Sequence, residues 1–75
     1  MTTFDSTFTF GKAVAIRGVE TVRYGLIIEI SKDRTKLAVM YLSSAERYQK
    51  YGPVRLQISI DDINDGLYEV IPLSV

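Results

Sequence analysis

The chain has 75 residues, in which nine Lys and Arg balance nine Asp and Glu, and it contains no His, Cys or Trp. This length predicts one domain, residues 1–75, near the lower size limit at which a single core is stable. Without Cys or His the sequence offers no disulfide, zinc site, thiol nucleophile or imidazole base. A net charge of zero argues against a protein that binds nucleic acid mainly through its overall field.

Residues 1–10 show no targeting signal, because they alternate Thr, Ser and Phe and have neither a basic start nor a continuous apolar run. No apolar run approaches the roughly 18 residues of a membrane span. We therefore expect a cytoplasmic protein with no membrane partner. Phe8 and Phe10 predict that residues 1–10 form an arm, which either pairs along a sheet edge or caps an opening of the core.

Apolar and polar residues alternate along much of the chain, which is typical of half-buried strands. This pattern predicts strands at 12–17, 24–31, 37–42, 54–60 and 67–71. In the second strand the alternation places Leu26, Ile28 and Ile30 together on one face, with Gly25, Glu29 and Ser31 opposite. The third strand is apolar on both faces, so we expect it inside the sheet. Pro72 is expected to end the pairing of the last strand.

Turn residues separate these segments. The polar residues 31–35 predict a hairpin, and residues 64–66 (Asn-Asp-Gly) predict a tight turn with a positive φ angle. Ser43, followed three residues later by Glu46, has the spacing of a helix capping box. It predicts a short helix at 44–51, inside the long connection before the fourth strand.

Five short strands, with one short helical turn before the fourth, predict an all-β fold, and closure into a small barrel would remove the exposed sheet edges. Residues 11–18 (GKAVAIRG), 24–30 (YGLIIEI) and 37–39 (LAV) resemble the KOW motif of SH3-like barrels. The resemblance covers about residues 11–71 and implies a five-stranded SH3-like barrel. An OB-type barrel remains the alternative fold.

Charge and aromatic residues suggest where such a barrel would bind. Residues 12–55 hold all nine cations and four acids, a net charge of +5, and the two ends together hold five acids. The segment 47–51 interleaves aromatic and basic side chains, which suit contact with a protein or a nucleic acid. The candidate binding residues are Arg17, Glu20, Arg23, Lys32, Arg34, Arg47, Tyr48, Lys50 and Tyr51.

The acidic segment 61–66 does not have the ligand spacing of a calcium loop, because Ile63 and Pro72 stand at its third and twelfth positions. Asp and Asn in this segment are better explained by turn formation. With no His to activate a hydroxyl group, we expect no enzyme, no cofactor and no metal.

We therefore expect a non-catalytic protein-interaction module, either a small accessory subunit or a phage-type factor, that docks on a larger protein complex. Its partner would be another protein or a second copy of the chain. The resemblance implies an alternative function, because KOW modules commonly bind RNA or RNA polymerase through the first loop, here residues 17–23.

Overall fold

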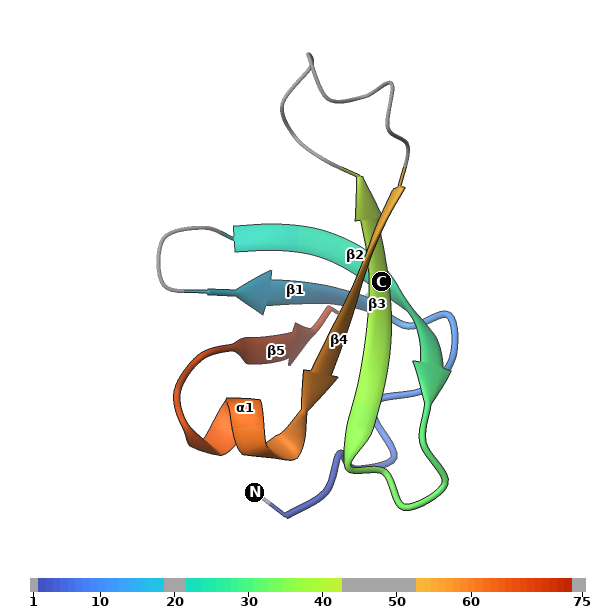
Figure 1. Ribbon diagram of the computed structural model, residues 1–75. Helices are drawn as coiled ribbons and strands as arrows, with labels where there is room; N and C mark the ends of the chain where they lie inside the picture. Colours follow the sequence, from blue (N-terminus) through green and yellow to red (C-terminus); the bar gives the residue numbers. More distant parts are fainter. Residues whose placement is uncertain (1, 19–21, 43–52, 74–75) are drawn as a thin grey trace.

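The computed structural model describes residues 2–18, 22–42 and 53–73. All five predicted strands are confirmed, with small changes at their ends (Figure 1). The elements in chain order are β1 (Ala13–Arg17), β2 (Val22–Ile30), β3 (Lys36–Leu42), β4 (Pro53–Ser59), α1 (Ile60–Asn64) and β5 (Glu69–Pro72). The helix predicted at 44–51 lies outside the described residues.

The five strands form one antiparallel sheet in the order β4-β3-β2-β1-β5. The third strand lies inside the sheet as predicted, between β2 and β4. The sheet is open, with β4 and β5 at its edges, so its closure into a barrel is still a prediction. Pairing of β5 does not end before Pro72, which lies opposite Val14, and the Leu73 N–H donates to the Ala13 carbonyl at 3.0 Å.

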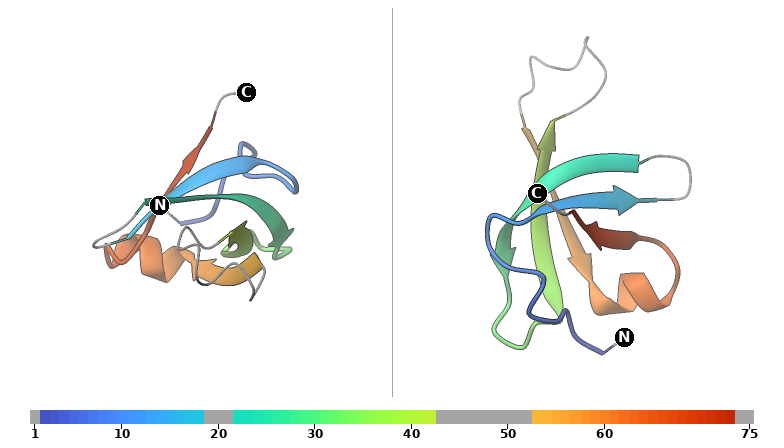
Figure 2. Two further views of the ribbon diagram at one scale, coloured as in Figure 1. Left: turned by 90° about the horizontal axis from the view of Figure 1, so that it is seen from above. Right: turned by 180° about the vertical axis from the view of Figure 1, so that it is seen from behind.

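β2 is long and curved, and it joins the two halves of the sheet (Figures 1 and 2). Its first part pairs with β1 and its last part with β3, and the two pairings overlap at Gly25 and Leu26. A Cβ atom on Gly25 would lie 2.5 Å from the Met40 carbonyl oxygen. Glycine therefore allows β2 and β3 to approach closely at this point.

A β-bulge corrects the predicted faces of β2. The pairing with β3 shifts between Ile27 and Glu29, so Ile28 is an extra residue. Ile27 is consequently fully buried, whereas Leu26 is 52% exposed. The prediction that Leu26 and Ile30 share one face was wrong, because they pair with Met40 and Leu37 on opposite faces of β3, and strict alternation cannot include an unpaired residue.

The core combines side chains from the sheet with two phenylalanines of the N-terminal arm. Phe4 and Phe8 are buried in edge-to-face contact, with ring centroids 5.4 Å apart. In the view from behind, Figure 2 shows the arm passing across the lower end of β3, and residues 2–11 form no strand. Of the two predicted roles, the arm therefore caps the core. The buried cluster consists of Phe4, Phe8, Val14, Ile16, Ile27, Leu37, Val39, Ile58, Ile60 and Val70.

Helix α1 corrects the prediction for the segment after β4. Ser59 accepts a hydrogen bond from the Asp62 N–H, and the Asp62 carboxylate accepts one from the Ser59 N–H. This reciprocal pair is a capping box, and it starts a helix at Ile60 where the sequence predicted strand and then turn. Gly66 has the expected positive φ angle, 80°, but its turn follows the helix.

Candidate interaction surface

The described candidate residues lie at the two ends of β2. Arg17 and Arg23 lie near its start, since Arg17 pairs with Val22 and Arg23 pairs with Ile16. Lys32 and Arg34 lie in the hairpin that follows the end of β2. The structure therefore does not bring these four residues together. The remaining candidates, Glu20, Arg47, Tyr48, Lys50 and Tyr51, lie outside the described residues.

The two arginines near the start of β2 have different surroundings. Arg17 is exposed and forms an ion pair with Glu69 of β5, with 3.4 Å between nitrogen and oxygen. Arg23 places its guanidinium over the ring of Tyr41, 5.2 Å from the ring centre, which is a cation–π contact. Because adjacent residues of a strand point to opposite faces, Arg23 lies on the opposite face of the sheet from Val22, the partner of Arg17.

Arg34 binds the chain's own N-terminal arm. Its Nε donates to the Phe4 carbonyl at 2.7 Å, and its Nη2 donates to the carbonyls of Asp5 and Phe8. Arg34 also has a φ angle of 60°, a left-handed conformation that is unfavourable for residues other than glycine. The guanidinium group of Arg34 therefore binds the backbone of the arm, whereas Lys32 on the same hairpin is exposed.

Within the described part of the chain, a prominent apolar surface involves residues that were not predicted as binding residues. Tyr24, Leu26 and Met40 are 68%, 52% and 40% exposed, and we call them the β2–β3 apolar patch. Leu26 lies directly opposite Met40 in the pairing, so both side chains occupy one face of the sheet. They line an open groove of about 350 Å³ whose walls are Tyr24, Gly25, Leu26, Ile28, Met40, Tyr41 and Pro53.

Sequence reasoning missed this patch because it grouped Leu26 with Ile28 and Ile30 on one face of the strand. Leu26 precedes the bulge at Ile28, so the alternation of the apolar residues changes phase between them. One residue in the sequence could have indicated this patch. Tyr24 lies two residues before Leu26, so the two side chains point to the same face, and the phenol group of a tyrosine is suited to a partly exposed position. The alternation from Tyr24 to Leu26 therefore indicates an exposed face.

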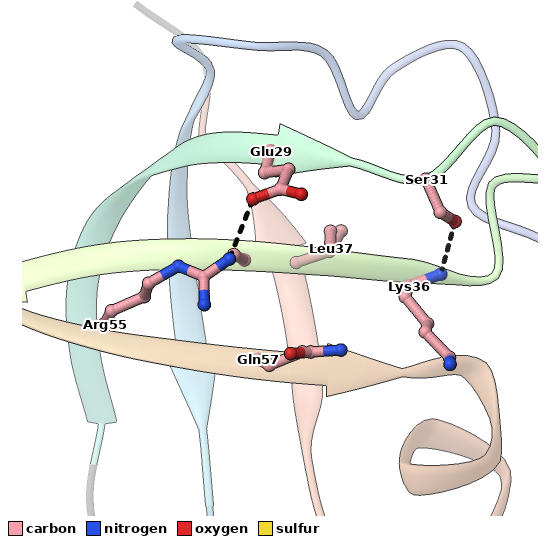
Figure 3. A pocket seen from close by; sticks show the side chains of 7 residues that line it. Glu29, Ser31, Lys36, Leu37, Arg55 and Gln57 are labelled. Atoms are coloured by element: carbon pink, nitrogen blue, oxygen red, sulfur yellow. Dashed lines mark hydrogen bonds and ion pairs between the residues drawn. The ribbon is translucent and has the colours of Figure 1, made fainter.

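A small polar pocket lies farther along the sheet (Figure 3). Arg55 of β4 donates to the Glu29 carboxylate of β2 at 2.7 Å, across β3. Both side chains are more than half exposed. The pocket has a volume of about 50 Å³ and is too small for a typical organic substrate. Its two charged side chains, Arg55 and Glu29, form an exposed ion pair that connects β4 with β2.

Two carboxyl groups on the loops have lowered pKa values. Hydrogen bonds from Thr35 and Ser31 lower the pKa of Asp33, those from the Thr35 side chain having the largest effect. A hydrogen bond from the Thr7 backbone N–H is the main cause that lowers the pKa of Asp5. Both are acceptors in local turns. Among residues 2–18, 22–42 and 53–73, no cluster of acidic side chains could hold a metal ion.

Comparisons of the chain with protein-family models, with curated proteins and with solved structures find no match. In the part of the chain that the structure describes, no helix is long and apolar enough to cross a membrane.

Proposed function

We propose that the protein is a non-catalytic interaction module, a small accessory subunit that docks on a larger protein through the β2–β3 apolar patch. The observation that carries this proposal is the exposure of Tyr24, Leu26 and Met40 side by side on strands of the sheet. Large exposed apolar side chains that form a contiguous patch are typical of protein contacts. Tyrosine and methionine are also enriched at protein interfaces.

The proposed fold of this module is the SH3-like barrel. The antiparallel order, the curved β2 shared by two strand pairs and the short last strand support it. Side chains from both halves of the sheet and from the arm pack in a single core. Such a small domain buries little surface of its own, so a stable partner would add to its burial.

The basic residues favour a protein over a nucleic acid as the partner. Arg17 is paired with Glu69, Arg55 is paired with Glu29, and Arg34 binds backbone carbonyls. Binding to phosphates would require a continuous group of available cations. The four described arginines instead lie at separate places, each beside an acceptor or an aromatic ring.

The proposal is tested with Leu26→Glu and the matched control Leu67→Glu. Leu67 is 50% exposed, close to the 52% of Leu26, and lies between α1 and β5. Affinity capture from the native host, with quantitative mass spectrometry, would identify a partner that the wild type retains. We expect Leu26→Glu to weaken its binding by roughly tenfold or more, because a buried interface excludes an unpaired charge. Loss with both variants, or with neither, would contradict docking through this patch.

The nucleic-acid alternative predicts a different result. Titration with single-stranded and duplex RNA and DNA would then show affinity that decreases steeply with salt, by about one unit of log–log slope for each phosphate contact. We expect no binding of this kind. Salt-dependent binding that survives Leu26→Glu would replace the protein-docking proposal.

A further inference from the structure

Among the described strands, only β3 pairs with β4, so the outer edge of β4 presents backbone groups at known positions. The Ile60 N–H donates to the Thr35 carbonyl, which shows that residues of even number in β4 direct their backbone toward β3. The odd-numbered residues therefore direct their N–H and C=O groups outward. The Ser59 N–H confirms this parity, because it is bonded to the Asp62 carboxylate instead of to β3.

Arg55 and Gln57 are consequently the residues whose amide groups are available along this edge. Pro53 lacks an N–H, and the N–H of Ser59 is already bonded within the capping box. Both Arg55 and Gln57 are exposed, and Figure 3 shows their side chains on β4, with that of Arg55 bonded to Glu29. The edge thus offers a short segment with donors and acceptors on both middle residues, which is the requirement for adding a strand.

The other edge of the sheet is better protected. β5 has four residues, and Leu73 donates to Ala13 on its paired side. By alternation the nitrogen of Pro72 lies on the outer side, where it can donate no hydrogen bond. Proline on an edge strand blocks the addition of another strand. Strand addition is therefore expected at β4.

We propose that the occupant of the β4 edge is a second copy of this chain, paired antiparallel about a two-fold axis at Leu56. In this register Arg55 of one copy faces Gln57 of the other, so the two amide pairs bond reciprocally. Leu56 faces its own counterpart, and Val54, which is 38% exposed, faces Ile58 of the second copy.

The two neighbouring registers are less favourable, one because of charge and the other because of an occupied amide group. An axis at Arg55 would place two arginines directly opposite each other, and like charges in that arrangement are destabilising. An axis at Gln57 would place Arg55 opposite Ser59, whose N–H is occupied and which is followed at once by α1. The sequence of the edge is therefore self-complementary about Leu56, which an isologous interface requires.

The first test measures the mass of the full chain by sedimentation equilibrium, from about 10 μM to about 1 mM. We expect a reversible dimer. Gln57→Lys, which faces Arg55 of the second copy, should weaken it by roughly tenfold, and Gln57→Glu should tighten it. A chain that is monomeric throughout this range, or a dimer that responds equally to the two substitutions, would overturn the proposal.

The second test fixes the register and uses the lack of native cysteine. Leu56→Cys places two thiols opposite each other in a non-hydrogen-bonded pair, so mild oxidation should give a covalent dimer. Val54→Cys is the control, because its thiols would be about 13 Å apart along the strands. A cross-link that forms as fast at position 54 as at 56 would contradict the register. Circular dichroism confirms that each variant is folded.

Discussion

The Nε of Arg34 donates a hydrogen bond to the backbone oxygen of Phe4 at 2.7 Å, which connects the β2–β3 hairpin to a segment 30 residues earlier. The same guanidinium also reaches the carbonyls of Asp5 and Phe8. A planar guanidinium can hold several acceptors at once, which an ammonium group does with less geometric definition. This contact fixes the arm that carries two core phenylalanines.

We expect Arg34→Ala to lower the free energy of unfolding by about 2–3 kcal/mol, because it removes charge-assisted hydrogen bonds and leaves partly buried carbonyls without a partner. Urea unfolding followed by circular dichroism measures the change. Arg34→Lys should recover only part of the loss, since it keeps the charge but loses the fork. Lys32→Ala, on the same hairpin, is the control and should change stability by less than about 0.5 kcal/mol. Similar losses for Arg34→Ala and Lys32→Ala would show that the carbonyl contacts contribute little.

The buried phenylalanines of the arm are expected to support the whole core. Phe4→Ala should cost about 3–5 kcal/mol through lost burial and the cavity that remains, which is a large part of the stability of a small domain. Phe10 is 78% exposed, so Phe10→Ala is the matched control and should have little effect. Thermal unfolding compares the two variants. The milder Phe4→Leu keeps the test useful where Phe4→Ala does not fold. Equal melting temperatures for all three variants would exclude the arm from the core.

The lowered pKa of Asp33 predicts a loss of stability in acid. The folded state keeps Asp33 ionised below the ordinary pKa of aspartate, so the unfolded state takes up its proton first as the pH decreases. The stabilisation is therefore complete above the unfolded pKa of about 3.9 and decreases through the lower folded pKa. Urea midpoints between about pH 7 and about pH 2 measure this dependence. Asp33→Asn should be less stable near neutral pH and should lose less stability on acidification. A dependence identical to that of the wild type would contradict the assignment.

The close approach at Gly25 predicts that even a methyl group is unfavourable there. Gly25→Ala would place its Cβ 2.5 Å from the Met40 carbonyl oxygen and 2.8 Å from a methyl group of Val39. Because backbone must move to relieve this contact, we expect a loss of about 1–3 kcal/mol in the free energy of unfolding. Gly66→Ala, where a Cβ would meet no atom within 4 Å, measures the cost of a positive φ angle alone. A Gly25→Ala variant as stable as the wild type would show that β2 and β3 can separate.

The strands were predictable from the sequence because alternation is a local property that each strand repeats several times. Ile58 and Ile60 are buried as their alternation in the fourth strand indicated. Alternation failed at Leu26, where the register of β2 changes at the bulge. A bulge depends on the pairing of two strands, so one strand's sequence does not reveal it.

Helix α1 and the candidate binding residue Arg34 show a second limit of prediction from the sequence alone. The sequence prediction used the capping-box spacing at Ser43 and Glu46 but did not apply it to Ser59 and Asp62, where the structure contains a capping box. Arg34 was predicted to bind a partner from its exposed hairpin position, but its donors bind a segment that is distant in sequence. Sequence shows that a side chain can donate, whereas only the fold shows which acceptor it reaches.

The pairing of β1 with β5 determines when this protein can fold during synthesis. Val14 of β1 lies opposite Pro72 of β5. β1 therefore cannot pair with β5 until almost all of the described residues have been synthesised. On the ribosome, β1 to β4 would emerge with the β5 side of β1 still uncovered. Folding is therefore expected to finish only after residue 72 has left the exit tunnel.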